Sequence, residues 1–361
     1  PTAGTSNVRF GVNAGNSIAS GGNYNVVVGD EAGTAITTGD FNTALGYAAL
    51  DAAVLVNNNV AVGSASLSTN VHSSKNVAVG SNSLETHNLG SAGDGYNTAV
   101  GYNSGLSVTT GTGNTLIGGL VGDAITTGSN NVGLGRSALT ANTTASNNTA
   151  IGMASLAANT TGADNTAVGR DALTLNTTGT HNTAVGKNTL DSNTTASFNT
   201  AVGSQAMDVN TTGAKNVAVG YAALNVNTTA ADNTGIGYFA LGANTTGASN
   251  TSMGSLSLDA NTTGNDNTAV GVNALTSNTT ASNNTAVGVN SLNASTTGES
   301  NVALGRDAML SNTTASNNTA LGGSALRLNT TGTLNTAVGT GSLAANTTAN
   351  YNTAMGYSAL T

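Results

Sequence analysis

The sequence has 361 residues, of which 7% are charged; it contains 48 glycines and no cysteine, and its net charge is −8. With only eight Lys and Arg and no basic stripe, this composition argues against a nucleic-acid-binding protein. The sequence has no run of about eighteen apolar residues, so it predicts no membrane span. The lack of cysteine excludes disulfides and thiolate metal sites.

A phrase of seventeen residues repeats along the chain, with clean copies reading NTAVGRDALTLNTTGTH at 165–181 and NTAVGKNTLDSNTTASF at 182–198. Each copy opens with five residues, here called the pentad, which begin with Asn and end with Gly. So short a unit buries a core only by stacking on its neighbours. Because Gly, Asn and Thr recur too densely for helices, the sequence predicts an all-β fold. We expect a parallel β-solenoid of about twenty coils.

Residues 1–130 follow the phrase loosely, and residues 131–361 follow it closely; we predict that together they form one continuous domain. Four extra residues between the pentad glycines Gly80 and Gly101 predict a loop near 85–96. Four early coils carry Gly where the regular phrase has Leu, and we expect a repacked corner in each. Their apolar residue comes three positions later, at Ile18, Ile36, Val108 and Ile125.

Two columns of identical residues are predicted to form a structural ladder. Stacked Asn side chains can exchange hydrogen bonds from coil to coil, and the pentad glycine allows a turn or a positive φ. In the regular part these residues are Asn131, Asn148, Asn165, Asn182 and Asn199, with Gly135, Gly152, Gly169, Gly186 and Gly203.

The inward face of the pentad is left open by the sequence, because alternate strand residues point to opposite sides. We expect Val168 and Leu173, with their equivalents, to fill a narrow interior. Ala167 would then lie on the other face, where a column of small residues could form a contact between chains.

No catalytic constellation is visible, so we expect a protein that is not an enzyme and that needs no cofactor or metal. His72 and His87 are expected to be surface residues rather than metal ligands. A glycan-degrading enzyme would need a paired-carboxylate groove that interrupts the repeat, and the repeat shows no such interruption. The twelve NTT triplets from Asn142 to Asn346 match the glycosylation sequon, but their regular spacing favours a structural corner.

The positions directly before and after each pentad vary from copy to copy and often carry large residues. This variation indicates that they are exposed. Tyrosine there can bind sugars or protein surfaces. The candidate recognition residues are Tyr47, Tyr102, Tyr221, Tyr238 and Tyr357.

The pattern NTAVGxxALxxNTTGxx resembles repeats of bacteriophage and prophage tail fibres. Its pentad is more distantly similar to the head repeats of trimeric autotransporter adhesins, which form parallel β-rolls. The resemblance implies a structural fibre, adhesin head or extracellular filament for surface attachment, located outside the cell, on its surface or on a virion. The resemblance implies a homotrimer. Because neither end of the given sequence carries a polar cap, the alternative expectation is a head-to-tail filament of copies. The exposed tyrosines suggest a cell-surface glycan or protein receptor as a further partner.

An alternative hypothesis is an ice-binding β-solenoid with stacked Thr columns about 4.8 Å apart. The Thr residues of the NTT corner, such as Thr143 and Thr144, are adjacent in sequence. Adjacent residues should point to opposite faces, which argues against this alternative.

Overall fold

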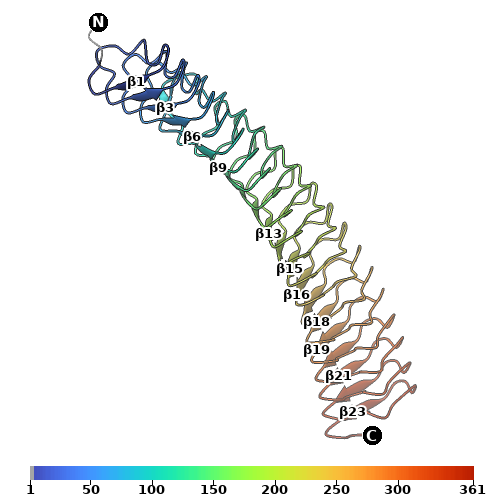
Figure 1. The fold of residues 1–361 in the computed structure, drawn as a ribbon. Coiled ribbons are helices and arrows are strands. Elements are labelled where there is room, and N and C mark those ends of the chain that lie inside the picture. Colours follow the sequence, from blue (N-terminus) through green and yellow to red (C-terminus); the bar gives the residue numbers. More distant parts are fainter. Residues whose placement is uncertain (1–3) are drawn as a thin grey trace. The chain divides into compact units, whose positions relative to one another are not determined.

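The structure is a computed structural model that describes residues 4–361; residues 1–3 of the predicted segment 1–130 lie outside the described part. The chain divides into two compact units, the first ending at His181 and the second beginning at Asn182. Each unit is described by itself. In both, the strands lie one after another along one side of the stacked coils (Figure 1).

The described residues form short strands joined by turns, without a helix, so the predicted parallel β-solenoid of about twenty coils is confirmed. Strands of neighbouring coils pair in parallel with a shift of seventeen residues, as in Thr149↔Thr166 and Thr268↔Thr285. The strands of the first unit are β1 (Val8–Phe10), β2 (Val26–Val28), β3 (Thr43–Leu45), β4 (Val60–Val62), β5 (Ser73–Ser74), β6 (Val77–Val79), β7 (Gly93–Asp94), β8 (Thr98–Val100), β9 (Thr115–Ile117), β10 (Val132–Leu134), β11 (Thr149–Ile151) and β12 (Thr166–Val168). Those of the second unit are β13 (Thr183–Val185), β14 (Thr200–Val202), β15 (Val217–Val219), β16 (Thr234–Ile236), β17 (Thr251–Met253), β18 (Thr268–Val270), β19 (Thr285–Val287), β20 (Val302–Leu304), β21 (Thr319–Leu321), β22 (Thr336–Val338) and β23 (Thr353–Met355).

The pentad asparagines form a ladder inside each unit. The backbone N–H of Asn148 donates to Oδ1 of Asn131 at 3.0 Å, and Asn199 donates in the same way to Asn182 at 3.0 Å. The side-chain amide also donates to a carbonyl fourteen residues ahead, as from Asn148 to Gly162 at 3.0 Å. Because these side chains are buried, each hydrogen bond satisfies a polar group that water cannot reach.

A second buried column is formed by the asparagines of the NTT corners. Nδ2 of Asn261 donates to Oδ1 of Asn244 at 2.8 Å and to the carbonyl of Gly264 at 3.0 Å. The first Thr of the corner is tied to the next coil as well, since Oγ1 of Thr262 donates to the Thr279 carbonyl at 2.9 Å. The corner asparagines from Asn142 to Asn329 are thus buried structural residues.

The pentad glycines are required by conformation and by space. Gly271 has a φ of 131°, which side chains oppose, and a Cβ there would lie 2.6 Å from the Gly288 carbonyl oxygen. The same conformation holds for Gly135, Gly152, Gly169, Gly186 and Gly203 of the predicted ladder. The backbones of neighbouring coils therefore meet directly at this column.

The predicted interior is wrong in one of its two columns. Leu173 is fully buried as expected, but Ala167 is buried beside it, whereas Val168 points outward and is half-buried. Leu173 has a positive φ of 52° that directs it across the narrow coil, so only a small side chain fits opposite. The column of Ala167 and its equivalents is therefore part of the core, and the expectation that it contacts other chains is wrong.

The early variant coils fill the same core from another position. Gly33 takes the left-handed φ of 55° at the place of Leu173, and Ile36 supplies the buried side chain from the corner. A Cβ on Gly33 would lie 2.9 Å from Cδ1 of Ile36, so the two solutions exclude each other. The apolar residues at the four variant corners are buried, with Ile18 6% exposed and Ile36, Val108 and Ile125 at 0%.

One coil of the second unit interrupts the corner ladder. Ser295 occupies the place of the corner asparagine, and both its Oγ and the Oδ1 of the preceding Asn278 are buried without a hydrogen-bond partner. A buried acceptor left unsatisfied costs about 1–3 kcal/mol.

We predict that Ser295→Asn stabilises the protein, because its amide would donate to Asn278 and to the Gly298 carbonyl. For a chain of 361 residues, a gain of about 1 kcal/mol corresponds to a rise of about 1–2 °C in melting temperature. Differential scanning calorimetry of the variant and the original chain measures this. The matched control, Asn261→Ser, creates a second gap and should lower the melting temperature by a similar amount. A variant no more stable than the original would contradict the ladder.

Candidate functional site

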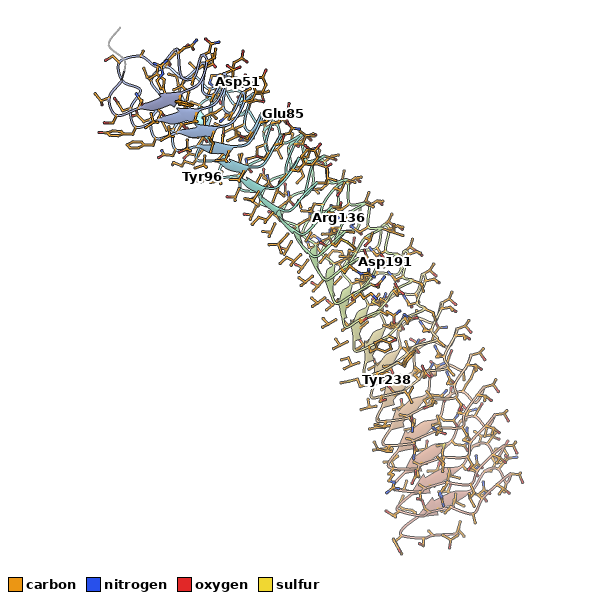
Figure 2. The ribbon with its side chains drawn as sticks, in the orientation of Figure 1. Asp51, Glu85, Tyr96, Arg136, Asp191 and Tyr238 are labelled. Atoms are coloured by element: carbon orange, nitrogen blue, oxygen red, sulfur yellow. The ribbon has the colours of Figure 1, made fainter. Side chains whose placement is uncertain are left out.

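The outward side of the main-sheet strands, here called the strand face, carries two side-chain columns in each unit. In the second unit the first column is Thr or Val and the second is Val, Ile, Leu or Met. Several of these side chains are well exposed, among them Leu304 at 45% and Met253 at 42%. Figure 2 shows the row of short side chains that projects from the strands.

The strand face holds no charged residue, although the chain contains eight basic and sixteen acidic residues. From β1 to β23, leaving out the short pair β5 and β7, each outward residue is Val, Thr, Leu, Ile, Met or Phe. Solvent-exposed positions of the same coils, such as those beside the pentad, vary freely between Asp, Lys, Ser and Tyr. This restriction sets the strand face apart from the other exposed positions of the same coils.

His87 is fully buried, so the expectation that it lies on the surface is wrong; His72 is half-buried. His87 occupies a position in the column of corner asparagines. Its Nε2 lies 2.8 Å from Oγ of Ser73 and 3.3 Å from Nδ2 of Asn97. Since the Nδ2 group of Asn97 can only donate, Nε2 of His87 is the acceptor and carries no proton. Burial lowers the pKa of His87 to about 4, which the nearby Thr109 backbone offsets only in part.

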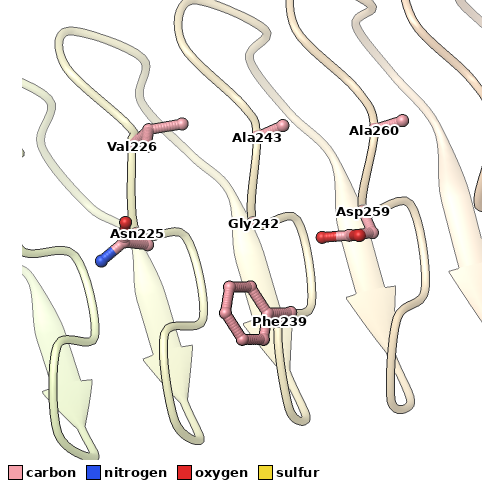
Figure 3. A pocket seen from close by; sticks show the side chains of 7 residues that line it. All are labelled: Asn225, Val226, Phe239, Gly242, Ala243, Asp259 and Ala260. Carbon is pink, nitrogen blue, oxygen red and sulfur yellow. The ribbon is translucent and has the colours of Figure 1, made fainter.

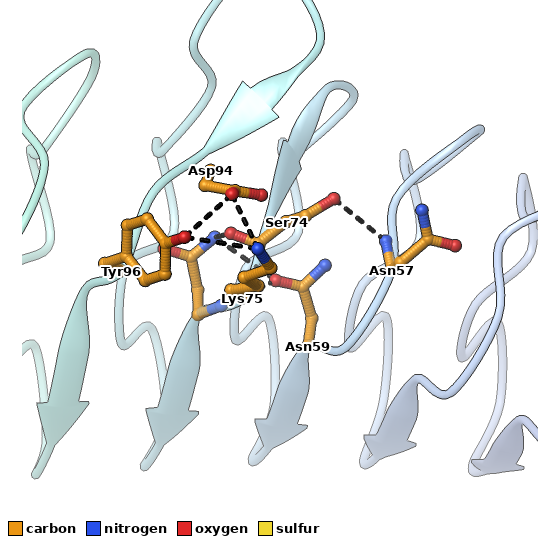
Figure 4. A network of polar contacts seen from close by, with 7 residues as sticks. Asn57, Asn59, Ser74, Lys75, Asp94 and Tyr96 are labelled. Atoms are coloured by element: carbon orange, nitrogen blue, oxygen red, sulfur yellow. Dashed lines mark hydrogen bonds and ion pairs between the residues drawn. The ribbon is translucent and has the colours of Figure 1, made fainter.

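The four-residue insertion adds a polar network to this coil (Figure 4). β7 pairs with β5, and residues 90–94 are exposed. Nζ of Lys75 lies 2.7 Å from Oδ2 of Asp94 and 3.1 Å from the Tyr96 hydroxyl. The bond to Asp94 raises the pKa of Lys75, and the Lys75 ammonium lowers the pKa of Asp94. As a surface network it fixes the insertion without making a reactive group.

The five candidate tyrosines are all exposed, but the structure brings only two of them into contact. Tyr221 and Tyr238 stack with ring centroids 5.7 Å apart. Tyr47 and Tyr102 lie in the first unit, 57% and 59% exposed, and Tyr357 at the last coil is 84% exposed.

Sequence reasoning missed the residue that completes this pair. Phe239 meets Tyr221 and Tyr238 edge-on, with centroid distances of 5.6 and 4.8 Å. It takes a positive φ of 51°, unfavourable for an aromatic residue. The available signal was its position, two residues after the pentad glycine, where no other coil has an aromatic side chain.

Other kinds of site find no support in the described part of the chain. Residues 4–361 contain no group of three or more His, Asp or Glu side chains placed to hold a metal ion. They contain no helix long and apolar enough to cross a membrane. No protein-family model matches the sequence, and a search of curated proteins finds no match.

Acid is predicted to weaken the coil that holds His87. Its pKa is about 4 when folded and 6.5 ordinarily, so between these values the unfolded chain binds more protons and stability falls as the pH falls. The shift corresponds to about 3 kcal/mol, lost between pH 6.5 and pH 4. Urea unfolding followed by circular dichroism across this range measures the loss.

His87→Asn, which restores the residue type of the column, should remove this part of the pH dependence. The half-buried His72 gives the control His72→Asn, which should keep it. Half-buried carboxyl groups whose pKa burial raises, such as Asp51 and Asp123, contribute equally to all three proteins and cancel in the comparison. Equal acid sensitivity of the original chain and His87→Asn would refute the prediction.

Proposed function

We propose that the protein is a structural, non-enzymatic fibre protein whose copies associate through the strand face, outside the cell or on a virion. The supporting observation is the strand face: two exposed columns of uncharged, largely apolar side chains on a parallel sheet. Parallel sheets are normally covered on both faces. Here the core of the coil covers one face of the sheet, and a second copy would cover the other, the strand face.

The size of the strand face suits a second copy of the chain. Strands lie about 4.8 Å apart and three residues span about 10 Å, so the strip on β13–β23 measures roughly 500 Å². Two such strips bury roughly 1,000 Å² in total, near the lower bound for a specific interface. The strip of the first unit adds to this. Since neither strip is charged, two copies bring no like charges together.

A homotrimer, as the resemblance to tail-fibre and adhesin repeats implies, would bury three such faces around one axis. The hydrogen-bonded Asn and Gly columns supply what a fibre needs, because each coil is fixed by both of its neighbours. The exposed columns outside the strand face then remain available for a receptor.

Charges introduced on the strand face are predicted to separate the copies. The double variant Val270→Lys and Val287→Lys places two ammonium groups on adjacent strands whose side chains point outward. The mass by light scattering after size exclusion should fall from a multiple of the 34.9 kDa chain to the chain mass. The circular dichroism spectrum should not change, since the core is untouched.

The control places the same charges at exposed corner residues of neighbouring coils, as Thr263→Lys and Thr280→Lys. This variant should keep the original mass. If the original protein runs as a single chain, or the strand-face variant keeps the original mass, association through the strand face is refuted.

Ice binding is the second candidate, favoured by one observation: on the strand face, Thr residues of adjacent coils stand in register, as Thr319↔Thr336 and Thr336↔Thr353 do. The column is interrupted by Val217 and Val302. The corner offers a single exposed Thr column, because the hydroxyl of Thr143 is bound to the Thr160 carbonyl at 3.2 Å while Thr144 is exposed.

The two candidates make opposite predictions for freezing. A face occupied by other copies should give no thermal hysteresis at high protein concentration, measured by nanolitre osmometry. Hysteresis that disappears in the Val270→Lys, Val287→Lys variant but persists in the corner control would assign the strand face to ice instead.

A further inference from the structure

The second unit has a hollow of about 480 Å³ on its surface, spanning three consecutive coils (Figure 3). Gly242 lies at its centre, between Asn225 of the preceding coil and Asp259 of the following one, and the Phe239 ring forms one wall. A volume of this size falls within the range of small-molecule sites.

The hollow exists because one side chain is missing. Gly242 is the only glycine among the twenty-one residues that stand five positions after a pentad glycine. Its φ lies outside the left-handed region, so the backbone does not require glycine there. A Cβ would lie 2.6 Å from Oδ1 of Asp259 and 3.1 Å from Cδ1 of Phe239. The same coil thus carries two exceptions to the repeat, an aromatic residue and a missing side chain, and they face one hollow.

The aromatic wall is held in place before any ligand arrives. Tyr221 and Tyr238 stack on each other, and both meet Phe239 edge-on. Such packing fixes the ring orientation and lowers the entropy lost on binding. The two tyrosines are themselves 46% and 53% exposed, so they extend the aromatic surface beyond the hollow.

Asp259 is the polar side chain that points toward Gly242, beside a mostly apolar floor formed by Val226, Ala243 and Ala260 (Figure 3). Nδ2 of Asn225 donates to the Gln205 carbonyl at 3.0 Å, which holds that amide toward the preceding coil and away from Gly242. The carboxylate of Asp259 is half-buried and makes no hydrogen bond that the described residues show, and burial raises its pKa. It is therefore an acceptor that gains from a hydroxyl donor.

We propose that this hollow binds one pyranose ring of a neutral glycan. Such a ring has an apolar C–H face, which suits Phe239 and the alanine floor, and an edge of hydroxyl groups. The carboxylate of Asp259, which points toward Gly242, can accept from two neighbouring hydroxyls of the ring.

An organic cation is the competing ligand, because an acidic group stands beside an aromatic ring. The geometry favours the sugar, since Phe239 is the one aromatic residue that lines the hollow, whereas a cation-binding cage needs several aromatic walls. The floor is also broad and apolar. A cation would owe its affinity mainly to the Asp259 charge and would be strongly salt-dependent.

Saturation-transfer-difference NMR on the full chain tests the proposal. The probes are methyl glycosides of glucose, galactose, mannose and N-acetylglucosamine, their 1,4-linked disaccharides, and tetramethylammonium. At least one sugar should bind with a Kd on the order of 1 mM. Gly242→Asn, which copies the residue of the preceding coil and so fits the fold, should weaken it at least tenfold. Phe239→Asn should do the same.

The matched controls are Ala344→Asn and Leu256→Asn, which introduce the same residue at the equivalent positions of other coils, outside the lining of the hollow. Both should bind like the original chain. All these variants keep the strand face, so the result is independent of association between copies. The proposal is overturned if no sugar binds or if Gly242→Asn binds sugar unchanged. It is also overturned if only tetramethylammonium binds, with an affinity that salt abolishes.

Discussion

The hydrogen bond between a buried asparagine and the backbone of the next coil is the constraint on which the rest of the structure depends. The pentad asparagines from Asn25 to Asn335 are buried, so their Oδ1 atoms depend on donors that the next coil places about 3 Å away, such as the backbone N–H groups of Asn148 and Asn199. A coil of another length meets this condition only if its extra residues leave the stack. The insertion does so: residues 90–94 are exposed, while Asn97 still donates to Asn76 at 3.1 Å.

A constant period permits a thin core built on strained residues. Leu173 and its equivalents hold a left-handed backbone that leucine disfavours, and they persist because the stack above and below fixes both ends of the turn. The variant coils relieve that strain with glycine and supply Ile36 or Val108 from another corner. Two packings thus share one backbone path, because the columns of Asn and Gly, rather than the apolar residues, set the path.

The period, the parallel pairing and the glycine turns could be predicted from sequence because each repeats along the chain. The inward face could not, since Ala167 and Val168 are both apolar and only the space left by Leu173 decides between them. His87 was misplaced because the insertion hid that it stands in the corner column. Phe239 and Gly242 were visible as exceptions to the repeat, but the fold was needed to show that they face the same hollow.

The glycine column, where each coil meets the next through backbone alone, bears on how such a chain changes over generations. Gain or loss of one seventeen-residue unit replaces an interface of Gly against Gly and Asn against Asn with an equivalent one. Unequal recombination between near-identical repeats therefore alters length while leaving each remaining coil correctly seated. The number of stacked coils is thus a heritable quantity that changes in whole units. A feature confined to one coil keeps its shape while the number of coils on either side of it changes.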